Sequence, residues 1–128
     1  MSNFEIKIVH LKVKLILLSI LFSSNIHSAC LDNAYTTLNI SDCYMKELAV
    51  AEYELRNTLN DAYKESNWIA DEIKQSQSDW LKYRESHCSA IYKSYGNGTM
   101  RLIAHPSCMV DLTKERQNQI YVEFVKGY

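Results

Sequence analysis

The residues best suited to metal binding or nucleophilic chemistry lie in two short segments. His87 and Cys88 are adjacent, and His105 precedes Cys108 by three positions. Zinc accepts thiolate and imidazole ligands, and a Cys–His pair can supply a nucleophile and its base. However, adjacent residues on a helix point about 100° apart, and thiols exported from the cell are oxidised to cystine. We therefore expect neither a zinc site nor a catalytic cysteine.

No other part of the sequence carries a catalytic signature. It contains no nucleophile elbow, no phosphate-binding glycine loop and no dinucleotide fingerprint. The acidic pair Asp71 and Glu72 fits a solvated helix start better than a glycosidase dyad. With 14 basic and 15 acidic residues the net charge is −1, whereas nucleic-acid binders show a basic surplus. We expect no enzyme activity, no cofactor, no small-molecule substrate and no nucleic-acid partner.

Residues 1–29 are predicted to be a secretory signal peptide. Lys7, Lys12 and Lys14 precede a short apolar run over residues 15–22, and small residues follow, with cleavage expected after Ser28 or Ala29. A stable span needs about 20 apolar residues, so a cleaved leader is favoured over a retained anchor. We expect an exported protein, periplasmic or secreted, with no stable membrane span after cleavage.

Residues 30–128 then form one domain and keep all of the cysteines: Cys30, Cys43, Cys88 and Cys108. An even number in an exported domain indicates disulfides, and three pairings are open. We choose the pairing that closes short loops, Cys30–Cys43 and Cys88–Cys108, each bridge contributing roughly 3 kcal/mol. Lipid attachment at Cys30 is disfavoured because it would leave an odd cysteine.

The domain is predicted to be all-α, a small bundle of three or four helices stapled by two disulfides, because no Gly or Pro occurs between residues 30 and 95. Ser41 or Asp42 is expected to cap the first helix. Its apolar face has helical spacing and consists of Leu48, Ala51, Leu55, Leu59, Ala62 and Tyr63. A break is expected at residues 64–67, with Ser66 or Asn67 capping the next helix, although one long bent helix is an alternative.

The second helix is expected from about residue 68 to 95 and the last from about 109 to 124, with Pro106 starting or kinking the latter. A typed motif lies on these two helices and comprises Gln77, Trp80, Tyr83, Arg84, Glu85 and Cys88, then Cys108, Leu112, Thr113 and Arg116. Together with the two upstream cysteines, this pattern resembles the lysozyme-inhibitor LprI-like domain family of small exported bacterial proteins.

The resemblance implies a protein partner. A lysozyme-type cell-wall hydrolase is the first candidate, and the alternative is an immunity or envelope protein with a secreted toxin or structural partner. The best element for insertion into a partner is the turn formed by Tyr95, Gly96, Asn97, Gly98 and Thr99. A bridge between Cys88 and Cys108 would brace this turn and reduce the entropy lost on binding. The alternative interpretation of the same residues is a glycine-capped helix end that begins the next helix.

Trp80, Tyr83, Arg84 and Cys88 share one helical face. That face is either a binding stripe or part of the core, and we favour the core because aromatic residues at helical spacing dominate cores. An arginine there needs a carboxylate. If the first two helices form an antiparallel hairpin about residues 66 and 67, Glu52 is the expected partner of Arg84, and Glu115 is the second candidate.

Overall fold

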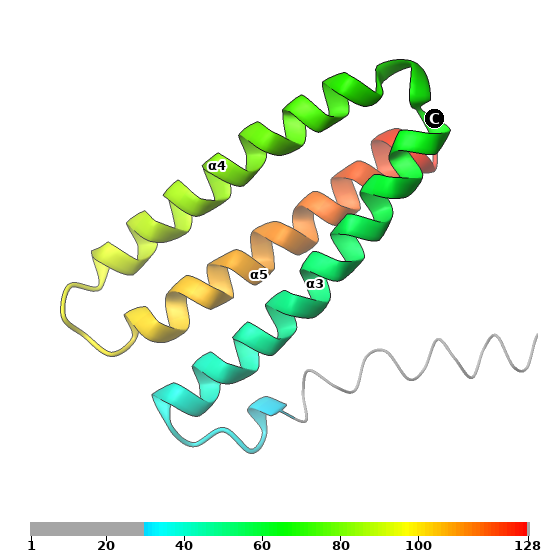
Figure 1. Ribbon diagram of the computed structural model, residues 1–128. Coiled ribbons are helices and arrows are strands. Elements are labelled where there is room, and N and C mark those ends of the chain that lie inside the picture. The colour runs from blue at the N-terminus through cyan, green and yellow to red at the C-terminus, as the bar shows by residue number, and fades with distance from the viewer. Residues whose placement is uncertain (1–29, 128) are drawn as a thin grey trace, which may run out of the picture. The chain divides into compact units, whose positions relative to one another are not determined.

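The computed structural model of the protein describes residues 30–127. The predicted signal peptide, its cleavage site and the alternative of a retained anchor all fall outside these residues. The helices below belong to one unit of the chain, Ala34–Tyr128. Within the described residues the elements are α3 (Thr37–Glu65), a short 3-10 turn η1 (Asn67–Ile69), α4 (Ala70–Ser94), α5 (Arg101–Ile120) and a π-helical turn η2 (Tyr121–Val125). The predicted all-α fold with three helices is confirmed (Figure 1).

Helix α3 begins earlier than the sequence predicted. Thr36 has an extended backbone and its hydroxyl accepts a hydrogen bond from the Asn39 N–H at 3.1 Å, which caps the helix. Ser41 and Asp42, the expected caps, therefore lie inside the helix. The predicted apolar face is confirmed, because Leu48, Ala51, Leu55, Leu59 and Ala62 are buried and Tyr63 is half-buried.

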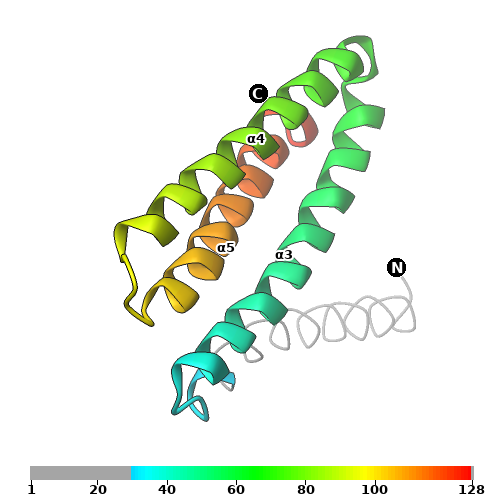
Figure 2. The ribbon, with the colours of Figure 1, turned by 60° about the vertical axis from the view of Figure 1, so that its left-hand side comes forward.

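The predicted break between the first two helices is confirmed, which excludes one long bent helix. The chain reverses through η1, and α4 runs back antiparallel to α3 (Figures 1 and 2). The prediction that Ser66 or Asn67 caps the next helix is wrong, since α4 has no side-chain cap. The Ser66 hydroxyl is buried and instead donates to the Phe124 carbonyl at 2.9 Å. A long-range acceptor thus displaces the local capping contact.

Helix α5 packs along both other helices, whereas α3 and α4 contact each other only sparsely. In both ribbon views α3 and α4 move apart with distance from the turn that joins them, and α5 lies along both helices (Figures 1 and 2). Pro106 lies inside α5 rather than at its start. Because proline has no N–H, the helix lacks one backbone bond there. After Ile120 the last turn widens, and the Lys126 N–H bonds to the Tyr121 carbonyl at 2.8 Å.

The core consists of two apolar clusters separated along the helices. One contains Leu48, Cys88, Cys108, Met109 and Val110. The other contains Leu55, Leu59, Ala62, Ile73 and Ile120. Between them on the three helices lie Glu52, Arg84 and Thr113, which we call the polar layer. The arrangement places the Arg84–Glu52 ion pair between the two apolar clusters.

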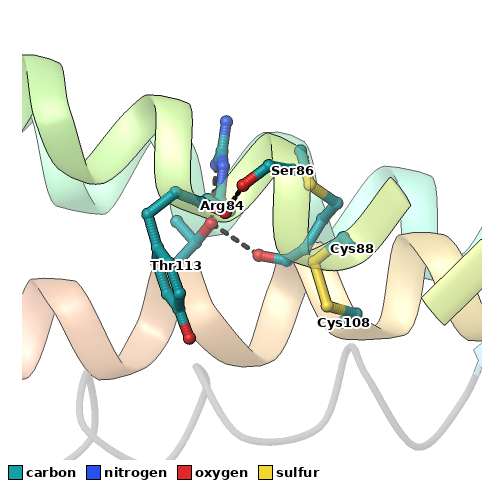
Figure 3. Close-up of a disulfide and its surroundings, with 7 residues drawn as sticks. Arg84, Ser86, Cys88, Cys108 and Thr113 are labelled. Atoms are coloured by element: carbon teal, nitrogen blue, oxygen red, sulfur yellow. Dashed lines mark hydrogen bonds between the residues drawn. A yellow bond between two sulfur atoms is a disulfide. The ribbon is translucent and has the colours of Figure 1, made fainter. Parts of the chain in front are cut away.

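Both predicted disulfides are confirmed. The Cys88–Cys108 bridge ties α4 to α5, with Cα atoms 5.7 Å apart (Figure 3), and Cys30 is paired with Cys43. A bridge between α4 and α5 limits how far their ends can separate where the intervening turn is exposed. Among residues 30–127, no helix is both long enough and apolar enough to cross a bilayer.

Candidate partner-binding site

Arg84 is the centre of the polar layer and contacts both neighbouring helices. Its Nη2 lies 3.0 Å from Oε1 of Glu52 on α3, and its Nη1 donates to the Thr113 hydroxyl of α5 at 2.7 Å. The predicted Arg84–Glu52 ion pair is therefore confirmed, and Glu115 is not the partner. Arg84 is 8% exposed and Thr113 is fully buried. Because α3 and α4 otherwise contact each other sparsely, this guanidinium is a principal link between them.

Thr113 is held in place for this contact by its own helix. Its hydroxyl donates to the Met109 carbonyl at 2.6 Å while it accepts from Arg84. One hydroxyl thus uses its donor inside α5 and an acceptor lone pair across the helix interface. Figure 3 shows Arg84 and Thr113 facing each other close to the Cys88–Cys108 bridge.

Arg116 makes the second polar link between α5 and α4. Its Nε donates to Gln77 at 3.1 Å, its Nη2 to Ser76 at 2.7 Å and its Nη1 to Gln119 at 2.7 Å. Burial lowers the pKa of Arg116, while Glu123 and Tyr63 oppose that shift. Arg116 is therefore held by hydrogen bonds to neutral acceptors, two of which lie on α4.

Trp80 lies between the two arginines. Its ring centroid is 5.1 Å from Cζ of Arg84 and 5.9 Å from Cζ of Arg116. Both distances lie within the range of cation–π attraction. Trp80 also packs against the second apolar cluster, which confirms the core interpretation for this residue. The core interpretation is wrong for Tyr83, which is 51% exposed and stacks on His87 with ring centroids 5.4 Å apart.

The remaining motif residues are likewise divided between the core and the surface. Leu112 packs against the first apolar cluster and is half-buried. Glu85 is exposed on α4. The structure therefore brings Gln77, Trp80, Arg84, Thr113 and Arg116 together inside the bundle and leaves Tyr83 and Glu85 on the surface.

The turn between α4 and α5, residues 95–99, is exposed along its whole length. Gly96 has a φ of +55°, a conformation that is unfavourable for residues with a Cβ. The end of α4 is therefore capped by a glycine, as the alternative interpretation of this turn predicted. Arg101 donates from Nη1 to the Gly96 carbonyl at 3.0 Å, and the Gly98 N–H bonds to the Tyr95 carbonyl at 3.0 Å. With the nearby disulfide, these bonds brace the turn, which is the property expected of a binding loop.

A hollow of about 360 Å³ lies beside this braced turn, between α4 and α5. Ile91, Ala104 and Leu112 supply apolar lining, and His87, Tyr95, Ser107 and Asp111 supply polar atoms, with Cys108 also in the wall. The sequence analysis missed this hollow. Helical spacing places His87, Ile91 and Tyr95 on one face of the second helix and Ala104, Cys108 and Asp111 on the last, but only the packing of the helices shows that the two faces meet.

The residues that suggested zinc or thiol chemistry have another arrangement. Cys88 and Cys108 are bonded to each other, so neither sulfur is available as a thiolate. His105 packs edge-on against Tyr92, with ring centroids 6.0 Å apart, and His87 stacks on Tyr83. Within the described part of the chain, no group of three or more His, Cys, Asp or Glu residues is placed to hold a metal ion.

Comparison with known proteins agrees with the motif. The family model described as "Lysozyme inhibitor LprI" matches residues 29–120, which include all four cysteines and both motif-bearing helices. No curated protein and no solved structure matches the chain significantly.

Proposed function

The chain belongs to the LprI family of lysozyme inhibitors, and from that premise we propose that it is an exported, non-catalytic protein that binds a lysozyme-type cell-wall hydrolase and blocks its cleft. The family match is the observation that carries this proposal. The signal-like sequence of residues 1–29 and the two disulfides support export, because disulfides persist in oxidising compartments.

The braced turn is the element that we propose enters the cleft. It projects at one end of the bundle, where α4 and α5 are joined (Figure 1). Tyr95 is 47% exposed and offers a large amphipathic ring. Its backbone neighbours are fixed by the contacts of Gly96 and Gly98, so binding orders little additional chain. A preformed, exposed turn with an aromatic anchor is the usual form of a protein that occupies a concave site.

Charge supports the same partner class. Residues 30–128 contain 11 basic and 14 acidic side chains, a net charge of −3. Lysozymes are usually basic, so the two proteins attract each other before contact, and the attraction weakens as salt is added. This charge difference speeds association more than it strengthens the complex.

The test is inhibition of cell-wall lysis by the exported, oxidised protein. We expect micromolar protein to slow the clearing of a bacterial suspension by a basic lysozyme. Tyr95→Ala should weaken inhibition without lowering the unfolding temperature, whereas Tyr53→Ala, which replaces a comparably exposed tyrosine on α3, should leave inhibition unchanged. No inhibition by the unaltered protein would refute the proposal and favour the alternative of a secreted toxin or structural partner.

A further inference from the structure

The hollow between α4 and α5 has the chemistry of a receptor for one extended, positively charged side chain. We propose that it takes a lysine or arginine side chain of the bound hydrolase, next to the turn that enters the cleft. This inference rests on the proposed function and adds to it a second, chemically defined contact.

The lining matches the two parts of such a side chain. Ile91, Ala104 and Leu112 are all half-buried and present apolar surface. Lysine and arginine cover apolar surface with their methylene stems while their charged ends stay near water. An apolar wall beside an open mouth therefore suits the stem of either residue.

Asp111 supplies the charge that the end of this side chain requires. It lines the hollow, is exposed, and forms no ion pair or hydrogen bond with any described residue. By contrast, Glu47 and Glu52 on α3 already face basic partners, Lys114 and Arg84. The carboxylate at the hollow is therefore free to receive a cation from outside.

The ring of Tyr95 at the hollow supports the same preference. Tyr95 lines it, and a tyrosine face attracts a cation. His87 lines it as well, and its ring is held by stacking on Tyr83 at 5.4 Å. Cys108 of the interhelical disulfide lies in the wall, so the two helices cannot separate freely there. The receptor surface is thus largely formed before binding, which limits the entropy cost.

Other occupants fit less well. An acidic side chain would face Asp111 and be repelled. A purely apolar side chain would cover the carboxylate without giving it a partner, and burial of an unpaired charge is strongly unfavourable. A basic hydrolase presents many lysine and arginine side chains, so the required group is abundant on the proposed partner.

The experiment measures binding of a basic lysozyme to the exported, oxidised protein by titration calorimetry at two salt concentrations. Asp111→Asn should weaken binding by about tenfold and Asp111→Lys by considerably more, because a charge contact is first lost and then reversed. Ala104→Leu, which fills the hollow, should also weaken binding. The matched control is Glu54→Gln, which replaces an exposed carboxylate on α3 that pairs with no basic group in the described part of the chain, and it should change binding by less than about twofold.

The salt dependence gives an independent readout. Asp111→Asn should reduce the loss of affinity with added salt more than Glu54→Gln does, because only Asp111 is expected to contact the partner's charge. Unfolding temperatures of the Asp111 and Glu54 variants should stay within a few degrees of the unaltered protein, since both side chains are exposed.

The outcomes separate the two proposals. If the unaltered protein binds lysozyme and both Asp111 variants bind equally well, the receptor role of the hollow is refuted and the proposed function stands. If the unaltered protein does not bind lysozyme, the proposed function is refuted, and the inference that rests on it fails with it.

Discussion

Replacing Glu52 by glutamine removes one charge from the polar layer while keeping the shape of the side chain. The amide oxygen of the new residue can still accept a hydrogen bond from Arg84, so the substitution isolates the ion pair. Arg84 remains 8% exposed and keeps its bond to Thr113 at 2.7 Å. The change therefore leaves a nearly buried guanidinium without its carboxylate.

The loss in free energy of unfolding that we expect for Glu52→Gln lies between the values for exposed and for fully buried ion pairs. Exposed pairs contribute about 0.2–1 kcal/mol, and removal of one partner from a fully buried pair costs about 3–5 kcal/mol. The Glu52 side chain is 44% exposed and that of Arg84 is 9% exposed, so solvent screens one end only. We expect Glu52→Gln to lower the free energy of unfolding by about 1–2 kcal/mol, or roughly 5–15 °C in unfolding temperature for a domain of this size.

Thermal and urea unfolding of the oxidised protein measure this loss. Glu54→Gln removes an exposed carboxylate two positions away that forms no ion pair with any described residue, and it should change stability by less than about 0.5 kcal/mol. Thr113→Val removes the other acceptor of Arg84, and the double variant should show coupling, because both residues bind the same guanidinium. A loss for Glu52→Gln no larger than that of Glu54→Gln would refute the assignment of Arg84 as the link between α3 and α4.

Two further predictions follow from the bridge and from the α4 surface. Replacing both Cys88 and Cys108 by serine, which opens a loop with a sequence separation of 20, should lower stability by roughly 3 kcal/mol in urea unfolding; an unchanged midpoint would contradict this. Hydrogen bonds from Gln75 and then Lys82 lower the pKa of Asp79, so its contribution to stability is present at neutral pH and is lost as the pH falls below the ordinary value of 3.8. Asp79→Asn should therefore lower the unfolding temperature at pH 7 but not at pH 2, and an equal effect at both would refute the assigned cause.

The helical core was predictable because its signal is local and periodic. Leu48, Ala51, Leu55, Leu59 and Ala62 are spaced three or four residues apart, and their burial follows from that spacing alone. The Arg84–Glu52 pair was also predictable, because an antiparallel hairpin reversing near residue 66 brings these positions level. To predict this pair, the only additional information required was the position of the turn between the first two helices.

The helix boundaries were less predictable because several residues compete to cap each helix. Ser41 and Asp42 have a stronger intrinsic capping preference than Thr36, so local preference alone points to the wrong residues, and Thr36 is the observed cap. Ser66 bonds to a carbonyl 58 residues away, so its partner depends on how η2 packs. The widened turn η2 itself has no local sequence signal of this kind.

The contacts between helices explain why the motif and the binding surface differ. Gln77, Arg84, Thr113 and Arg116 are at most 8% exposed, and each makes a hydrogen bond to a neighbouring helix or to its own helix, although Nε of Arg84 is buried without a partner among the described residues. These residues can determine the register of α4 and α5, but they have little surface left to contact another protein. The proposed choice of target therefore rests on exposed groups outside the buried motif. Asn97 on the braced turn and Asp111 at the hollow are both exposed, and so we expect a chain with the same motif but a different turn to keep this fold and to differ in the partner that it binds.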